Sequence, residues 1–255
     1  MVVLKSESEL ATMREAGRIV ARTLAAASAA ARPGVRLTDL DALAADLIAS
    51  LGGKPSFRGY QPRFAPTPFP AVLCLSVNDE IIHGIPDRRA LRDGDLLSID
   101  CGAVVDGYHG DAAVTVTVGA ADPAGQRLAG TADAALAAGI AAARPGGRLG
   151  DIGHAVATVC DRAGYGSPDG FGGHGVGTAL HEQPDVPNRG RPGRGMPLRE
   201  GLVLAIEPMV IESGRDEVRI RADGWTVATA DGSRAAHAEH TVAVTADGPV
   251  ILTAE

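Results

Sequence analysis

The chain has 255 residues, a length that suits one large domain or two small ones and allows a substantial core. Its net charge of −7 argues against a nucleic-acid-binding protein, because such proteins usually concentrate basic residues on one face. The three cysteines lie too far apart in sequence for a metal knuckle or a redox pair. The N-terminus turns polar too early for a secretory signal, and no apolar run could span a bilayer. We therefore expect a cytoplasmic protein with reduced thiols.

The first part of the chain predicts two helices. Ser6 and Glu9 form a capping-box pattern before a run of apolar residues at helical spacing, and residues 32–34 (Arg-Pro-Gly) end this helix. A second helical run follows and stops at the two glycines 52–53. Residues 54–70 are rich in proline and turn residues, which predicts a loop.

The rest of the chain predicts strands, then helices, then strands again. Residues 95–118 read as two strands, and residues 126–143 and 150–162 as two helices. The segment 164–200 is rich in glycine and proline and is expected to be irregular, and long irregular segments in compact domains often carry function. From residue 202 to the end, the pattern predicts strands and turns.

Two pairs of segments resemble each other at a separation of about 110 residues. These pairs are AAARPGVRLTDLDAL (29–43) with AAARPGGRLGDIGHA (141–155), and LRDGDLLSID (91–100) with LREGLVLAIE (198–207). Coincidence in a sequence rich in alanine and glycine is a serious rival explanation for the first pair. The second pair is harder to dismiss because both copies end in a carboxylate. We expect a single catalytic domain over 1–255, built from related halves at roughly 1–120 and 121–255.

The carboxylates of the first half can be placed by the geometry of a hairpin. Asp106-Gly107 is a strong two-residue turn between two β-rich runs. A turn of this length places Gly102 opposite Asp111, and Asp100 points to the same face as Gly102 because side chains alternate along a strand. Two carboxylates facing each other on a largely apolar strand pair repel, so a positive charge or a shared proton must compensate.

The second half supplies a matching pair of carboxylates. Glu207 ends an apolar strand, and Glu239 precedes another β-rich run; by the repeat, Glu207 corresponds to Asp100 and, more loosely, Glu239 to Asp111. A single carboxylate at a strand end is usually solvated or capping, but four at corresponding places suggest a shared role. Four carboxylates can bind two divalent cations about 3.5–4 Å apart. An added histidine favours Mn, Fe, Co or Zn over Ca.

Three histidines are candidates for the same site. His174 lies between glycines that allow close approach of the backbone, and we predict that it is a neutral nitrogen ligand. His181 follows seven residues later and is expected to act as an acid or as a hydrogen-bond donor to a substrate carbonyl. His83 either contacts substrate or caps a turn, and its spacing favours neither.

The remaining four histidines carry weaker predictions. His109 and His240 lie close in sequence to two candidate ligands, Asp111 and Glu239, and we expect their side chains to face away from the metal side. We expect these two either to serve packing or to support the ligands from behind. His154 and His237 show no pattern that suggests a role.

Six segments, in this order, resemble the methionine aminopeptidases, specifically the short bacterial-type (type I) form. They are SVNDEIIHGIPD (76–87), GDLLSIDCGAVVDGYHGDAAVTVTVG (94–119), GGHGVGTALHEQP (172–184), AIEPMV (205–210), DGWTVATADG (223–232) and AEHTVAVT (238–245). The resemblance covers nearly the whole chain and implies an α+β pita-bread fold. In that fold two pseudo-symmetric halves share a central antiparallel sheet with flanking helices.

The resemblance also implies the roles of individual residues. It implies metal ligation by Asp100, Asp111, His174, Glu207 and Glu239. It implies catalysis by His83, His181 and Glu207, with Glu207 as ligand and proton shuttle, and a substrate site of His83, His181, Tyr60, Phe69, Cys74 and Trp225. Three residues depart from those usual in the family: Phe69, Leu180 and Arg189. The 57–69 loop also looks longer than is usual in the family, which bears on the alignment of Tyr60. These departures concern the shape of the methionine pocket and leave the metal ligands intact.

The function implied is removal of the initiator methionine from nascent polypeptides and peptides, with a small second residue preferred. The implied cofactors are two divalent ions (Co, Mn, Fe or Zn) that activate water. The resemblance fits a monomer that meets nascent chains and makes at most transient ribosome contact, with no membrane or specific nucleic acid as partner.

Three alternatives remain within the same fold. A prolidase or Xaa-Pro aminopeptidase usually carries a further N-terminal domain, whereas only about ninety residues precede the first ligand strand here. A non-catalytic binding homologue and a metal-free amidinohydrolase would have lost ligands that this chain retains.

Overall fold

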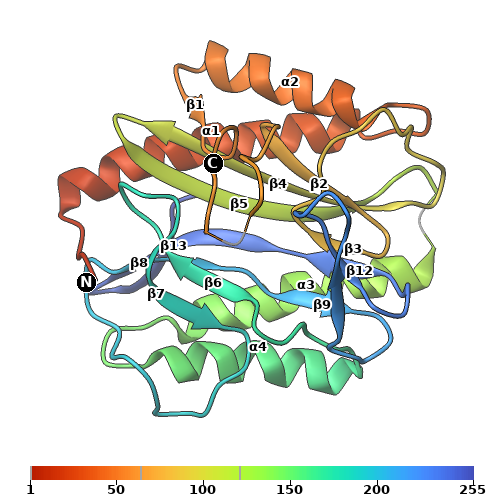
Figure 1. The fold of residues 1–255 in the computed structure, drawn as a ribbon. Coiled ribbons are helices and arrows are strands. Elements are labelled where there is room, and N and C mark those ends of the chain that lie inside the picture. Colours follow the sequence, from red (N-terminus) through yellow and green to blue (C-terminus); the bar gives the residue numbers. More distant parts are fainter. Residues whose placement is uncertain (1, 64, 121) are drawn as a thin grey trace.

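The protein is described here by a computed structural model of residues 2–63, 65–120 and 122–255. Four helices in this part of the chain flank a curved antiparallel sheet (Figure 1). The helices are α1 (Glu7–Ala30), α2 (Leu37–Ser50), α3 (Pro123–Ala142) and α4 (Leu149–Ala163). The first two cover one half of the sheet and the other two cover the other half, so each pair covers its own hydrophobic core.

The strands of the described residues belong to one large sheet and two small ones. They are β1 (Lys54–Pro55), β2 (Leu73–Val77), β3 (Glu80–Ile82), β4 (Leu96–Val105), β5 (Tyr108–Thr117), β6 (Gly172–Gly175), β7 (Glu182–Pro187), β8 (Val203–Ile206), β9 (Met209–Ile211), β10 (Val218–Ile220), β11 (Val227–Thr229), β12 (Ala235–His237), β13 (Glu239–Thr245) and β14 (Gly248–Ile251). The large sheet runs β1-β4-β5-β13-β8-β6-β7, with β2 beside β4 and β14 beside β13. The small sheets are β10-β11-β3 and β12-β9.

Local sequence signals account for the boundaries of α1 and of the first hairpin. Ser6 and Glu9 form the predicted capping box, in which the Glu9 carboxylate accepts the Ser6 N–H at 2.7 Å. Asp106 and Gly107 both have positive φ (46° and 83°), as a tight two-residue hairpin turn requires. The resulting register pairs Gly102 with Asp111, which confirms the geometry predicted from the sequence.

The two sequence repeats occupy equivalent places in the structure. The Gly34 N–H donates to the Leu91 carbonyl at 2.8 Å, and the Gly146 N–H donates to the Leu198 carbonyl at 3.1 Å. In both halves, a hydrogen bond thus links the turn before a helix (α2 or α4) to the segment that precedes the strand with the carboxylate. This correspondence supports the interpretation of two related halves, while their boundary near residue 120 stays a prediction.

The segment 164–200 is more regular than its composition suggested, because it contains β6 and β7. Strand β6 is three glycines and a histidine, so it lacks the β-branched residues by which strands are recognised. Its glycines serve close packing: a Cβ on Gly173 would lie 2.0 Å from the Ala205 carbonyl oxygen. Within the described residues, no helix is both long and apolar enough to cross a membrane.

Candidate active site

Three carboxylates meet on one face of the large sheet because of its register. Ala113 of β5 pairs with Asp100 of β4 on one side and with Glu239 of β13 on the other. Asp111 lies two residues before Ala113 on β5, so its side chain points to the same face. The register of three neighbouring strands therefore brings these carboxylates together.

The adjoining strands add a histidine and a fourth carboxylate. His174 of β6 pairs with Ala205 of β8, and Glu207 follows Ala205 by two residues. The Nε2 atom of His174 lies 3.5 Å from Oε1 of Glu207. All five residues proposed from the sequence as metal ligands thus line a single cavity of about 300 Å³.

Burial changes the protonation of these groups. It raises the pKa of Asp100 to about 7 and that of Glu207 to about 8, and it raises the pKa of Asp111 and Glu239 as well. It lowers the pKa of His174 to about 4, so the imidazole is neutral at neutral pH and its contact with Glu207 is not an ion pair. The cluster is acidic and holds no compensating cationic side chain among the residues that line the cavity.

The donor atoms fit divalent cations. Buried carboxylate oxygens of Asp100, Asp111 and Glu239 have no hydrogen-bond partner among the described residues. Two sets of donors lie within 4.8 Å of one another: Asp111, His174 and Glu239, and Asp100, His237 and Glu239. Carboxylate oxygens combined with imidazole nitrogens are ligands typical of Mn, Fe, Co and Zn.

His237 belongs to this cluster although no sequence pattern suggested a role for it. Its side chain is buried, and Nε2 lies 3.5 Å from Oε2 of Glu207 and 3.9 Å from Oε2 of Glu239. The available signal was its spacing: in an extended segment, a residue two positions before Glu239 points to the same side.

The other end of the cavity is apolar and contains the pocket residues proposed from the sequence. Phe69 packs edge-on against Trp225, with ring centroids 5.1 Å apart, and Tyr60 and Cys74 complete this wall. Leu180, one of the departures from the family noted in the sequence, also lines this end, together with Phe57 and Pro62, which the resemblance did not single out.

His83 and His181 lie between the acidic and the apolar ends of the cavity. The ring of His181 stacks on Tyr60 at 5.2 Å and lies 3.9 Å from that of His174, centroid to centroid. His83 has a positive φ of 59° and faces the edge of Trp225. Burial lowers the pKa of both His83 and His181 to about 3, so each is a neutral imidazole that can donate one hydrogen bond.

Of the two histidines expected to face away from the carboxylates, only His240 does so. His109 lies two residues before Asp111 on β5, and side chains alternate along a strand, so His109 and Asp111 point to the same face. His109 contacts the Ser56 hydroxyl through Nδ1 at 2.9 Å, and His240 contacts the Thr253 hydroxyl in the same way at 2.9 Å. Neither lines the cavity.

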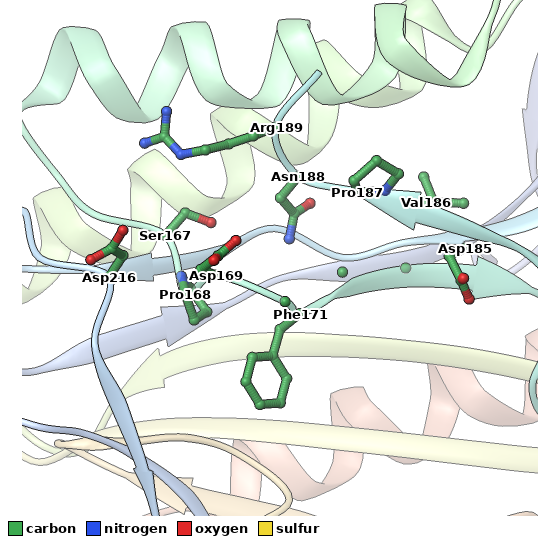
Figure 2. A pocket seen from close by; sticks show the side chains of 13 residues that line it. Ser167, Pro168, Asp169, Phe171, Asp185, Val186, Pro187, Asn188, Arg189 and Asp216 are labelled. Atoms are coloured by element: carbon green, nitrogen blue, oxygen red, sulfur yellow. The ribbon is translucent and has the colours of Figure 1, made fainter. Parts of the chain in front are cut away.

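A second cavity, of about 370 Å³, lies beside the loop that leads into β6 (Figure 2). Ser167, Asp169 and Asp216 gather at one end of it and Asp185 at the other. Its described lining contains neither histidine nor cysteine, so we place the candidate active site in the first cavity. The two are linked by Asn188, whose side-chain amide donates to the main-chain carbonyl of Glu207 at 2.9 Å.

Comparison with known proteins agrees with this site. A sequence model described as metallopeptidase family M24 matches residues 11–246. The chain belongs to this family. It is 48% identical to methionine aminopeptidase 1 of Mycobacterium tuberculosis over 99% of this chain and 95% of the relative. It also matches the crystal structure of methionine aminopeptidase from Thermotoga maritima with a TM-score of 0.95, 41% identity and full coverage of both chains.

These matches confirm the resemblance to the methionine aminopeptidases and the pita-bread fold. The fold is shared more widely, since a prolidase from Pyrococcus furiosus superposes with a TM-score of 0.78 at 22% identity. That match covers 99% of this chain but 66% of the prolidase, and at this identity it supports the fold alone.

Proposed function

We propose that this chain removes the N-terminal methionine from peptides and nascent polypeptides, with a preference for a small second residue. The observation that carries the proposal is the composition of one cavity. A cluster of buried carboxylates and a neutral imidazole adjoins an apolar recess in the same space of about 300 Å³. The first end suits hydrolysis at a metal centre, and the second suits an apolar side chain next to the bond that is cut.

The proposed cofactors are two divalent cations, with Co, Mn, Fe or Zn as candidates. The residues that would hold them are Asp100, Asp111, His174, Glu207 and Glu239. Bound cations would act as Lewis acids and lower the pKa of water toward neutrality. The orphaned oxygens of the cluster support this assignment.

The side chains have separate tasks in the proposed reaction. Glu207 lies in the carboxylate cluster beside His174, and we assign its carboxylate the transfer of a proton from water to the leaving amine. His181 and His83 are neutral and donate hydrogen bonds to the carbonyl oxygen and the leaving nitrogen, where charge develops in the transition state.

The apolar recess accounts for the choice of the first residue. Phe69, Trp225 and the thiol of Cys74 present aromatic edges and a polarizable sulfur, which suit a flexible thioether. Tyr60 borders the same recess and stacks on His181, so the side-chain pocket lies directly beside the reacting carbonyl.

The test is an assay of the metal-loaded protein on three peptides: Met-Gly-X, Met-Leu-X and Ala-Pro-X. We expect fast release of methionine from the first and little turnover of the other two. Activity confined to the Ala-Pro peptide would instead identify an Xaa-Pro aminopeptidase. No activity on any peptide after metal loading would identify a non-catalytic homologue.

We also propose that the protein acts as a monomer in the cytoplasm, where nascent chains emerge, with at most transient ribosome contact. The acidic net charge disfavours stable binding to RNA. Sedimentation with and without ribosomes, at physiological salt, checks both statements: the protein should sediment as a monomer and leave ribosome pellets after a salt wash.

A further inference from the structure

His237 is the one buried imidazole of the cluster that the proposed mechanism leaves without a task. It is 1% exposed, and neither ring nitrogen has a hydrogen-bond partner among the described residues. A neutral imidazole carries one donor and one acceptor, and burying both unpaired costs free energy. An imidazole in this position therefore needs a binding partner for its nitrogen.

The surroundings of the ring indicate what that partner is. Nε2 lies 3.5 Å from a Glu207 oxygen and 3.9 Å from a Glu239 oxygen, and it forms a compact donor set with Asp100 and Glu239. These distances are long for hydrogen bonds. They are compatible with donors that converge on a cation from different directions, as His174 does with Asp111 and Glu239.

The backbone gives a second and independent reason. Ala113 and Glu239 are paired across β5 and β13, so a local two-fold axis relates residues on either side of this pair. Asp111 lies two residues before Ala113, and His237 lies two residues before Glu239. The local two-fold therefore relates His237 to Asp111. The sequence repeat had instead suggested that Glu239 corresponds to Asp111.

Two threonines anchor these equivalent positions in the same way. The Thr241 hydroxyl accepts the Asp111 N–H at 2.9 Å and donates to the Asp111 carbonyl at 2.8 Å. The Thr115 hydroxyl accepts the His237 N–H at 2.9 Å and donates to the His237 carbonyl at 2.7 Å. Both side chains are therefore presented to the cluster from a fixed backbone, which is the preorganisation that a metal ligand needs.

We propose that His237 is a metal ligand, so that each of the two cations is bound by one imidazole. His174 then serves one cation with Asp111, His237 serves the other with Asp100, and Glu239 is shared. This inference rests on the proposed metal-dependent function and extends the ligand set beyond the five residues named above. Two nitrogen donors shift the preference of the site toward Zn and Co and away from Mg and Ca.

The experiment is a titration of the metal-free full chain with Co²⁺, in the absence of peptide, followed by calorimetry and by proton NMR. A histidine bound to Co²⁺ gives a strongly shifted, exchangeable ring N–H signal. We expect two such signals in the wild-type chain and one in His237→Ala. The Kd of one Co²⁺ should rise by at least about 10-fold in this variant while the other changes little.

Matched variants separate a ligand from a merely structural residue. His174→Ala should remove the other N–H signal, whereas His240→Ala should keep both signals, because His240 faces the Thr253 hydroxyl. His237→Gln keeps a polar side chain in place if His237→Ala does not fold, and it should also lose one signal.

The outcomes distinguish this inference from the proposed function. Two shifted N–H signals and unchanged Co²⁺ affinity in both His237→Ala and His237→Gln would overturn the inference alone. A wild-type chain that binds no Co²⁺, or binds it without hydrolysing Met-Gly-X, would overturn the proposed function.

Discussion

Cys74 of β2 lies directly opposite Asp100 of β4 in the antiparallel ladder. The thiol is therefore a point where the apolar wall of the cavity meets the carboxylate cluster. Burial, with a smaller contribution from the charge of Asp100, raises the pKa of Cys74 well above its usual value. At neutral pH the thiol is neutral, and its contribution is shape and polarizability rather than nucleophilicity.

Enlarging this side chain should change substrate binding more than chemistry. Cys74→Leu adds carbon atoms at the wall of the recess, and we expect the KM for Met-Gly-X to rise about 10-fold, in line with the cost of one or two methylene groups in an apolar pocket. The kcat and the bound metal should change much less. Cys74→Ser, which conserves size, is the matched control. Loss of metal in Cys74→Leu would contradict a role confined to the pocket.

Glu207 should be needed for turnover even where metal binding survives. Glu207→Gln keeps one carbonyl oxygen for a cation but cannot accept a proton, so we expect kcat to fall at least about 100-fold. Metal content measured by mass spectrometry tells the two roles apart. Retained metal with near wild-type kcat would refute proton transfer by Glu207.

His181 should be needed for catalysis but not for metal binding. Its ring stacks on Tyr60 and belongs to neither donor set, so His181→Ala should lower kcat/KM at least about 100-fold while metal content stays unchanged. His154, exposed on α4, offers the matched control, since His154→Ala should have wild-type kinetics. Metal loss in His181→Ala would place this residue among the ligands.

The parts of the site that depend on short-range geometry could be predicted from the sequence. The Asp106-Gly107 turn determines the register of its hairpin, and with it the relation between Asp100 and Asp111. The repeat that ends in Asp100 and Glu207 paired two strands that do lie at one cavity. His174 and Glu239 depended more on the family resemblance, because nothing local relates them to the hairpin.

The parts that depend on distant packing could not be predicted. His237 has no motif of its own. Its spacing from Glu239 puts both side chains on one face, but only the pairing of Ala113 with Glu239 brings that face to the cluster. Strand β6 has the composition of a loop, and only its pairing with β7 and β8 makes it a strand. Phe57 and Leu180 come from different halves of the chain and meet at the recess through tertiary packing alone.

The buried carboxylates should make the metal-free protein less stable as the pH rises above 6.5. Burial raises the pKa of Asp100 to about 7 and that of Glu207 to about 8, so the folded chain keeps protons that the unfolded chain releases. Unfolding free energy therefore falls as the pH rises toward 8. The buried histidines act in the opposite sense only below their ordinary pKa of 6.5, because burial lowers the pKa of His83 and His181 to about 3.

Thermal unfolding of metal-free protein between pH 6.5 and 8.5 measures this effect. We expect Tm to fall across this range, and the fall to be shallower in Glu207→Gln, which has no proton to lose. A Tm that rises over the same range would mean that the carboxylates have ordinary pKa values in the folded chain.

The final prediction concerns Lys5, which lies far from the cluster in sequence but fixes the loop of His181. Its Nζ lies 2.6 Å from the Glu182 carboxylate, and this pair is largely buried. Glu182 in turn accepts the Ala179 N–H at 3.2 Å. Gly177 leaves room for the pair, since a Cβ there would lie 2.4 Å from Oε1 of Glu182 and 2.7 Å from Nζ of Lys5. Within the described residues, no hydrogen bond holds the His181 ring, so its position depends on ring stacking and on this anchored backbone.

Lys5→Met should therefore lower kcat/KM for Met-Gly-X about 10-fold, because small displacements of a catalytic group are costly. In a His181→Ala background the same substitution should cost less than about 2-fold, since its effect passes through a ring that is no longer present. Lys54→Met, at the exposed β1, is the matched control and should change neither background. Equal losses in both backgrounds would show that Lys5 supports the fold in general rather than His181, because independent effects multiply whereas effects through one residue do not.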